Sequence, residues 1–74
     1  MRLNISMLPE AKLVHLFDVA ARAKNEFLAM KIVNELTGRN HISIEDQLRK
    51  LGQRASENKN TLSFQMVSKL WNRW

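Results

Sequence analysis

The sequence predicts a small, mainly helical domain of three or four helices, preceded by either a short strand or an extended arm. Three observations support this prediction. Apolar residues recur at the spacing of an amphipathic helix along most of the chain. Two glycines and one proline interrupt the 74 residues, so there are few breaks between segments. Apolar residues make up 45% of the chain, as in globular proteins, and the length fits one domain over residues 1–74.

The first helix is expected from Pro9 to Ala23, because a proline loses no hydrogen bond at the first helical position. Its apolar residues share one broad face, and four polar residues lie opposite: Lys12, His15, Asp18 and Arg22. From Asn25 to Leu36 the apolar stripe lies on a different side. Two structures fit this switch. Either Asn25 caps a second helix, or one long helix buries different faces against different neighbours. The absence of glycine and proline at the switch slightly favours the long helix.

The third helix is expected to begin after a loop that follows Leu36. Gly38 predicts that the preceding helix ends near Leu36, since glycine is common just beyond a helix end. Ser43 is a good N-cap, with Asp46 three residues on in a variant of the capping box. The helix that follows has a narrow apolar stripe: Ile44, Leu48, Leu51 and Ala55. Gly52 lies within it and is expected to let a neighbouring backbone come close.

A polar turn over residues 58–60 separates this helix from a fourth one. Thr61 can cap the fourth helix, which is expected from about Leu62 to the end of the chain. Its apolar residues span more than half of the helix circumference. A stripe of this width predicts contacts with more than one neighbouring element.

The composition excludes several classes of protein and site. Without cysteine the chain has neither a disulfide framework nor a thiolate metal site. No apolar run approaches the roughly 18 residues of a membrane span, and the N-terminus lacks the apolar region of a secretory signal, so we expect a cytoplasmic protein. Because His15 and His41 lack a carboxylate cluster and the glycines are isolated, we expect no enzyme, metal, cofactor or small-molecule substrate.

Positive charge is concentrated in the second half of the chain. Residues 1–37 hold five basic and four acidic side chains, whereas residues 38–74 hold seven basic and three acidic. Arg49, Lys50 and Arg54 lie off the apolar stripe of the third helix, where they would form a ridge that neutralises phosphates. Arg39 and Lys59 add to this candidate nucleic-acid surface. The alternative interpretation is an ordinary solvated helix face.

The aromatic residues near the C-terminus suggest a second kind of surface. Phe64, Leu70, Trp71 and Trp74 are expected to be core residues or anchors for a partner, since Trp is enriched in interface hot spots. Stacking on unpaired bases is an alternative for the tryptophans. Membrane-surface binding is not expected, because the polar residues of this helix are mostly Ser, Asn and Gln.

The N-terminal half resembles the ribbon-helix-helix repressors over residues 2–36. Residues 2–7 alternate polar and apolar side chains, and a proline and an amphipathic helix follow. The resemblance implies that two chains pair their strands and that Arg2, Asn4 and Ser6 read bases in the major groove. A helix-turn-helix formed by the third and fourth helices is a further alternative, although its turn lacks the usual glycine.

We therefore expect a small, basic, non-enzymatic regulatory protein of the transcriptional-regulator kind, which binds nucleic acid as a homodimer. The dimer is expected because so small a helical chain leaves apolar surface to cover. The alternative function is that of a helical inhibitor, antirepressor or adaptor that binds a protein partner with an acidic surface.

Overall fold

The computed structural model describes residues 5–73 and confirms the mainly helical class. A 3-10 helix η1 (Ile5–Met7) precedes the α-helices α1 (Glu10–Arg22), α2 (Glu26–Asn40), α3 (Ile44–Glu57) and α4 (Thr61–Arg73). These residues form no strand. None of their helices is both long and apolar enough to span a membrane.

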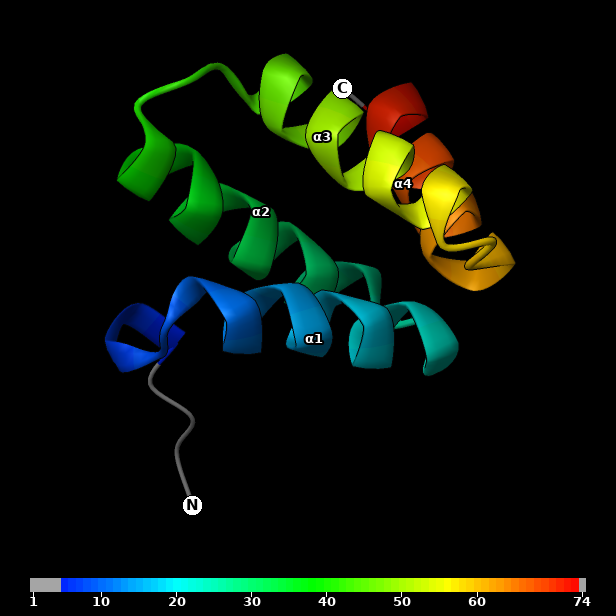
Figure 1. Cartoon of the computed structure of the whole chain (residues 1–74), viewed down its shortest axis with the longest axis horizontal. Coiled ribbons are helices and arrows are strands. Elements are labelled where there is room, and N and C mark those ends of the chain that lie inside the picture. The colour runs from blue at the N-terminus through cyan, green and yellow to red at the C-terminus, as the bar shows by residue number, and fades with distance from the viewer. Residues whose placement is uncertain (1–4, 74) are drawn as a thin grey trace.

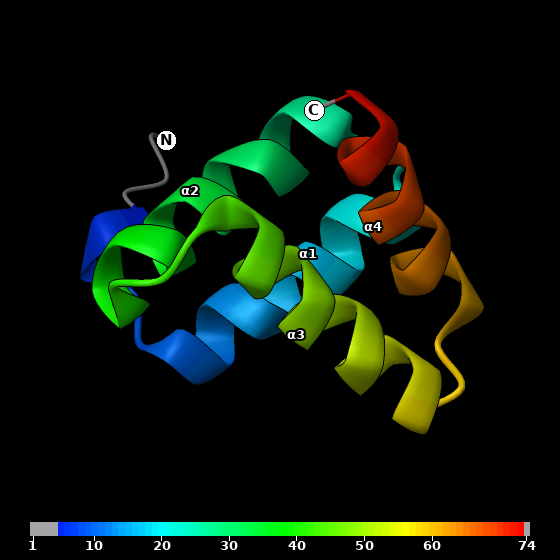
Figure 2. The same cartoon turned by 90° about the horizontal axis from the view of Figure 1, so that it is seen from above.

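The four α-helices form two hairpins that pack across each other. In Figure 1, α1 and α2 run side by side in opposite directions, and so do α3 and α4. Figure 2 shows from above how the two hairpins cross. Helix α4 contacts α1 and α2 as well as α3, which confirms the prediction made from its wide apolar stripe. Because α3 and α4 pack as an antiparallel pair, they do not form a helix-turn-helix.

All four α-helices contribute to one hydrophobic core. Its largest members lie on one stripe of each helix, where they face the other hairpin. They are Leu13, Phe17, Ile32, Val33, Leu36, Leu48, Leu51, Met66 and Leu70. Helix α3 approaches α4 closely at Gly52, where an added Cβ would lie 3.3 Å from Val67 Cγ1. The space at this glycine is thus filled by a side chain, where the sequence predicted the approach of a backbone.

The first hairpin turns at Lys24 and Asn25, so the long continuous helix that we favoured is wrong. Lys24 takes a left-handed backbone conformation with φ 55°. Asn25 then caps α2, because its side-chain oxygen accepts a hydrogen bond from the Leu28 amide at 3.1 Å. The turn needs no glycine, since the amides of Lys24 and Asn25 donate to carbonyls at the end of α1.

Helix α2 continues past the predicted end at Leu36, through Gly38, to Asn40. The residue just beyond the helix end is His41, at φ 53°, and not Gly38 as predicted. His41 takes the left-handed conformation that glycine commonly takes at this position. The added turn is held by side chains, since Arg39 bonds Glu35 at 2.9 Å and Asn40 donates to Gln47 at 3.0 Å.

The caps of the next two helices are serine and asparagine. Ser43 caps α3 as predicted, because its hydroxyl oxygen accepts from the Asp46 amide at 3.1 Å. For α4 the prediction of Thr61 is wrong. Asn60 Oδ1 accepts from the Ser63 amide at 3.2 Å, and Thr61 is the first helical residue.

The predicted N-terminal strand is not seen in the residues that the structure describes. Ile5–Met7 forms the 3-10 helix η1, and the guanidinium of Arg39 holds it by donating to the carbonyls of Ile5 and Ser6 at 3.2 and 3.0 Å. The rest of the predicted strand or arm, including Arg2 and Asn4, lies outside the described residues.

Candidate functional site

Three of the predicted nucleic-acid-binding cations are exposed on α3 or at its end. They are Arg49, Lys50 and Lys59. Lys59 lies in the turn between α3 and α4 and takes the left-handed conformation, with φ 55°. Of the base-reading residues implied by the resemblance, only Ser6 is described, and it is exposed in η1.

Arg54, the fourth predicted cation of this region, forms an ion pair within the protein and is not a free cation. Its guanidinium makes two hydrogen bonds to the Asp18 carboxylate, at 3.2 and 3.1 Å. The Ser63 hydroxyl donates to the same carboxylate at 2.7 Å. Arg49 and Arg54 are five residues apart and therefore point in directions roughly 140° apart on a helix. The two arginines cannot form one ridge.

Asp18 is buried, although its place in the helical pattern put it on the solvent side of α1. Burial would raise the pKa of Asp18. The hydrogen bonds from Arg54 and Ser63, with the charges of Arg54 and His15, outweigh burial and hold this pKa below its ordinary value. Asp18 thus remains a carboxylate that joins α1 to α3 and α4. Its two partners lie far along the chain, so no local pattern could have revealed it.

Arg39 also has a structural role instead of the predicted contact with nucleic acid. It pairs with Glu35 on the same helix and anchors η1. Its side chain is 27% exposed. Its Nε and Nη2 groups already donate to Glu35 and to the carbonyls of Ile5 and Ser6, so most of its donors serve contacts within the protein.

The hairpin of α3 and α4 carries a groove on its outer side. Its larger hollow, of about 470 Å³, has an apolar floor that includes Leu48, Gly52 and Val67. A second hollow of about 350 Å³ lies towards the α3–α4 turn. Phe64 lines both hollows and is the one residue that they share.

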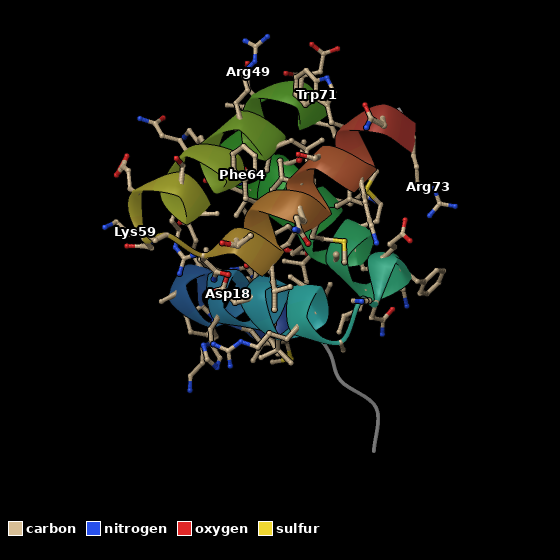
Figure 3. All side chains as sticks on the ribbon, turned by 90° about the vertical axis from the view of Figure 1, so that its right-hand side faces the viewer. Asp18, Arg49, Lys59, Phe64, Trp71 and Arg73 are labelled. Atoms are coloured by element: carbon tan, nitrogen blue, oxygen red, sulfur yellow. The ribbon has the colours of Figure 1, made fainter. Side chains whose placement is uncertain are left out.

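Two partly exposed aromatic rings flank this groove. Phe64 is 48% exposed and Trp71 is 39% exposed. The guanidinium carbon of Arg49 lies 5.6 Å from the centre of the Trp71 ring, within the range of a cation–π contact. In Figure 3, Arg49 and Trp71 lie at one end of the face, Phe64 near its middle and Lys59 at the other end.

The charged residues that line the two hollows are Arg49 and Lys59, and both are positive. Among residues 5–73, Arg49 pairs with one acid, Asp46, at a long distance of 3.8 Å and in an exposed position. Gln53, Ser68 and Asn72 also line the larger hollow. Their side chains make no hydrogen bond to another described residue. We call this surface, with Arg49, Lys59, Phe64 and Trp71 as its main side chains, the binding face.

The structure thus unites members of two residue sets that the sequence kept apart. Arg49 and Lys59 came from the predicted nucleic-acid set, and Phe64 and Trp71 from the predicted partner set. Leu70, which we predicted as a partner contact or core residue, is 2% exposed and packs in the core. Trp74 lies outside the described residues. The antiparallel pairing of α3 and α4 brings the two sets together, and no local sequence pattern specifies that pairing.

No group of metal-ligating side chains is found among residues 5–73. Comparisons with protein-family models, with curated proteins and with solved structures found no match to this chain. The binding face is therefore interpreted from its own chemistry.

Proposed function

We propose that this protein binds nucleic acid through the binding face. It would act as a small regulator, by occupying the stretch of nucleic acid that it binds. One observation carries the proposal. The charged residues that line the groove are positive, and one of them lies over the face of a partly exposed tryptophan. Cations beside open aromatic faces match a ligand that combines phosphates with planar bases.

The charge balance of the whole protein supports the same ligand. The formal net charge is +5. Each described ion pair uses an arginine, so the lysines of residues 5–73 form no ion pair with a described acid. These lysines are also exposed. Lys50 lies next to Arg49 on the exposed side of α3. Such cations displace the counterions of a polyanion, which gives affinity that falls steeply with salt.

The first test is a titration of labelled 30-residue oligonucleotides, duplex and single-stranded, at several salt concentrations. We expect binding at low salt, with log Kd rising linearly with log salt concentration. Two or three phosphate contacts predict a slope of about 2. Failure of both oligonucleotides to bind at low salt would contradict the proposal.

Charge reversal locates the site. Arg49→Glu and Lys59→Glu are each expected to weaken binding and to reduce the salt slope by about 1. Lys12→Glu is the matched control, since it makes the same change of charge on α1, outside both hollows. An equal loss in all three variants would indicate attraction by net charge alone.

The apolar floor of the groove favours one other candidate, a protein partner with an acidic surface. Leu48, Gly52 and Val67 offer a docking surface for an apolar side chain, and Trp71 is a residue type common in hot spots. Such a partner would steer towards Arg49 and Lys59 by charge. Truncation of Trp71 would weaken the binding of such a partner. Because both candidates are attracted by charge, the oligonucleotide titration separates them: an acidic protein partner predicts no binding of either oligonucleotide at low salt.

A further inference from the structure

We infer that the nucleic acid bound by this face is single-stranded, with unpaired bases stacked on Trp71 and Phe64. The inference rests on the proposed function and specifies its ligand. It follows from the position of the aromatic rings, the width of the surface that carries them, and the neutral polar groups between them.

The two rings are spaced to hold separate bases. Phe64 and Trp71 are seven residues apart on α4, which places them about 10 Å apart along the helix axis. Each ring is partly exposed and flanks the larger hollow. A base that stacks on a ring must present its own flat face, and only an unpaired, unstacked base has a free one.

The width of the binding face excludes base contacts within a duplex. The groove lies between two helices, each about 10 Å wide with its side chains, so the surface is about 20 Å across. The major groove of B-DNA is about 12 Å wide and the minor groove about 6 Å. A helix pair placed broadside cannot enter either groove. On a duplex, Trp71 and Phe64 would therefore face the phosphate backbone and not the bases.

The same face provides partners for the remaining parts of a strand. Arg49 lies on α3, eight residues or about 12 Å before its end at Glu57, and Lys59 follows in the turn, so the two cations mark a length of about three to four nucleotides. Between them, Gln53, Ser68 and Asn72 present amide and hydroxyl groups to the larger hollow. These groups both donate and accept hydrogen bonds, as base edges require. None of these side chains selects for or against a 2′-hydroxyl, so single-stranded DNA and single-stranded RNA would make the same contacts.

The test compares a 15-residue thymidine oligodeoxynucleotide, the matching uridine oligoribonucleotide, and a 15-base-pair duplex at one salt concentration. A chain with Trp74→Phe leaves Trp71 as its one tryptophan, so fluorescence reports directly on the binding face. We expect tighter binding of the single strands than of the duplex, by about tenfold or more. We also expect quenching of Trp71 on binding. The two single-stranded arms then identify whether DNA or RNA is preferred.

Substitutions and altered ligands test stacking separately from charge. Trp71→Leu and Phe64→Leu keep an apolar side chain for folding but remove the ring, and each is expected to weaken single-strand binding about 5- to 150-fold. Leu62→Ala is the control, because Leu62 lies two residues before Phe64 on α4 and lines neither hollow. An oligonucleotide with abasic sites keeps the phosphates and should lose about the same factor. Circular dichroism verifies the fold of each variant.

The outcomes separate this inference from the proposed function. Preference for single strands, with loss on removal of the rings or the bases, supports both. Equal or tighter binding of the duplex, with no effect of the rings, overturns the single-strand inference and leaves nucleic-acid binding intact. Absence of binding to every oligonucleotide at low salt overturns the proposed function itself.

Discussion

At the residue scale, Asp18 is a buried carboxylate that joins one helix of the first hairpin to both helices of the second. It lies on α1 and accepts hydrogen bonds from Arg54 of α3 and Ser63 of α4. A buried carboxylate is tolerated only where its charge and its oxygens are satisfied, and here two charge-assisted bonds and a short hydroxyl bond do so. Removal of the charge affects both partners, since the side chains of Arg54 and Ser63 make no other hydrogen bond to a described residue.

Asp18→Asn is therefore expected to destabilise the protein by about 2 kcal/mol. The variant keeps the size of the side chain but loses the negative charge that Arg54 binds. The measurement is urea unfolding followed by circular dichroism at pH 7. Asp46→Asn is the control, because it makes the same change in the exposed 3.8 Å pair with Arg49 and should cost less than about 0.5 kcal/mol. Equal losses in the two variants would contradict a special role for Asp18.

The lowered pKa of Asp18 also predicts how stability depends on pH. The pKa lies below its ordinary value of 3.8 in the folded protein, so the folded state binds the proton less well than the unfolded state. The contribution of Asp18 to stability is complete above pH 5 and is lost as the pH falls through 3.8 and below. We expect a steeper loss of unfolding free energy between about pH 5 and pH 2 in the wild type than in Asp18→Asn. Parallel curves for the two proteins would rule this out.

At the element scale, all three turns between the α-helices carry a left-handed residue that is not glycine. These residues are Lys24, His41 and Lys59. An L-residue in this conformation costs about 1 kcal/mol because its Cβ approaches the following carbonyl. At Lys59 this backbone strain falls on a residue of the binding face. A cation is thus kept at a position where glycine would fit the backbone better.

Glycine at these turns is expected to separate stability from binding. Lys24→Gly and Lys59→Gly should each raise the unfolding free energy by a few tenths to about 1 kcal/mol, because relief of the strain exceeds the added flexibility of the unfolded chain. Lys59→Gly alone should weaken nucleic-acid binding. Thermal unfolding and the oligonucleotide titration together test this pair. Equal effects of both variants on binding would remove Lys59 from the binding face.

The same turns show where sequence reasoning stops. The apolar stripes predicted four helical segments and the cap at Ser43, because helix periodicity and capping are local properties. The break at Asn25 was one of two alternatives, but the absence of glycine there favoured the long helix, and the end at His41 was missed because Gly38 was taken as the marker of the helix end. Likewise, Arg54 was assigned to the surface because its partner Asp18 lies 36 residues away along the chain.

At the scale of the whole molecule, a second apolar surface lies on α2 and α4, away from the binding face. Phe27 is 73% exposed beside a hollow of about 490 Å³ that Met30 and Leu70 also line. Glu26 and Arg73 edge the hollow and pair with each other at 2.8 Å. Lys31 Nζ lies 4.9 Å from the centre of the Phe27 ring, so the ring has a cation on one side. An exposed apolar ring beside an apolar hollow can be covered by the same patch of a second copy, as a two-fold dimer requires.

We therefore expect a dimer formed through Phe27. Sedimentation equilibrium at micromolar concentrations should give twice the mass of the 8.7 kDa chain. Phe27→Asp should give the monomer, because a charge would be desolvated in the interface. Met7→Asp is the control, since Met7 is 80% exposed and lies outside this hollow. A wild-type chain that stays monomeric at these concentrations would refute the dimer.

The arrangement in two hairpins also determines how quickly the native state is reached. Within each hairpin the helices are neighbours in sequence and are joined by three residues, so most contacts close short loops. Topologies of this kind fold in microseconds to milliseconds. The bonds of Asp18 span 36 and 45 residues and can form only when the hairpins dock. Asp18→Asn should consequently speed unfolding and leave the refolding rate nearly unchanged in stopped-flow experiments, whereas slower refolding would place docking before the rate-limiting barrier.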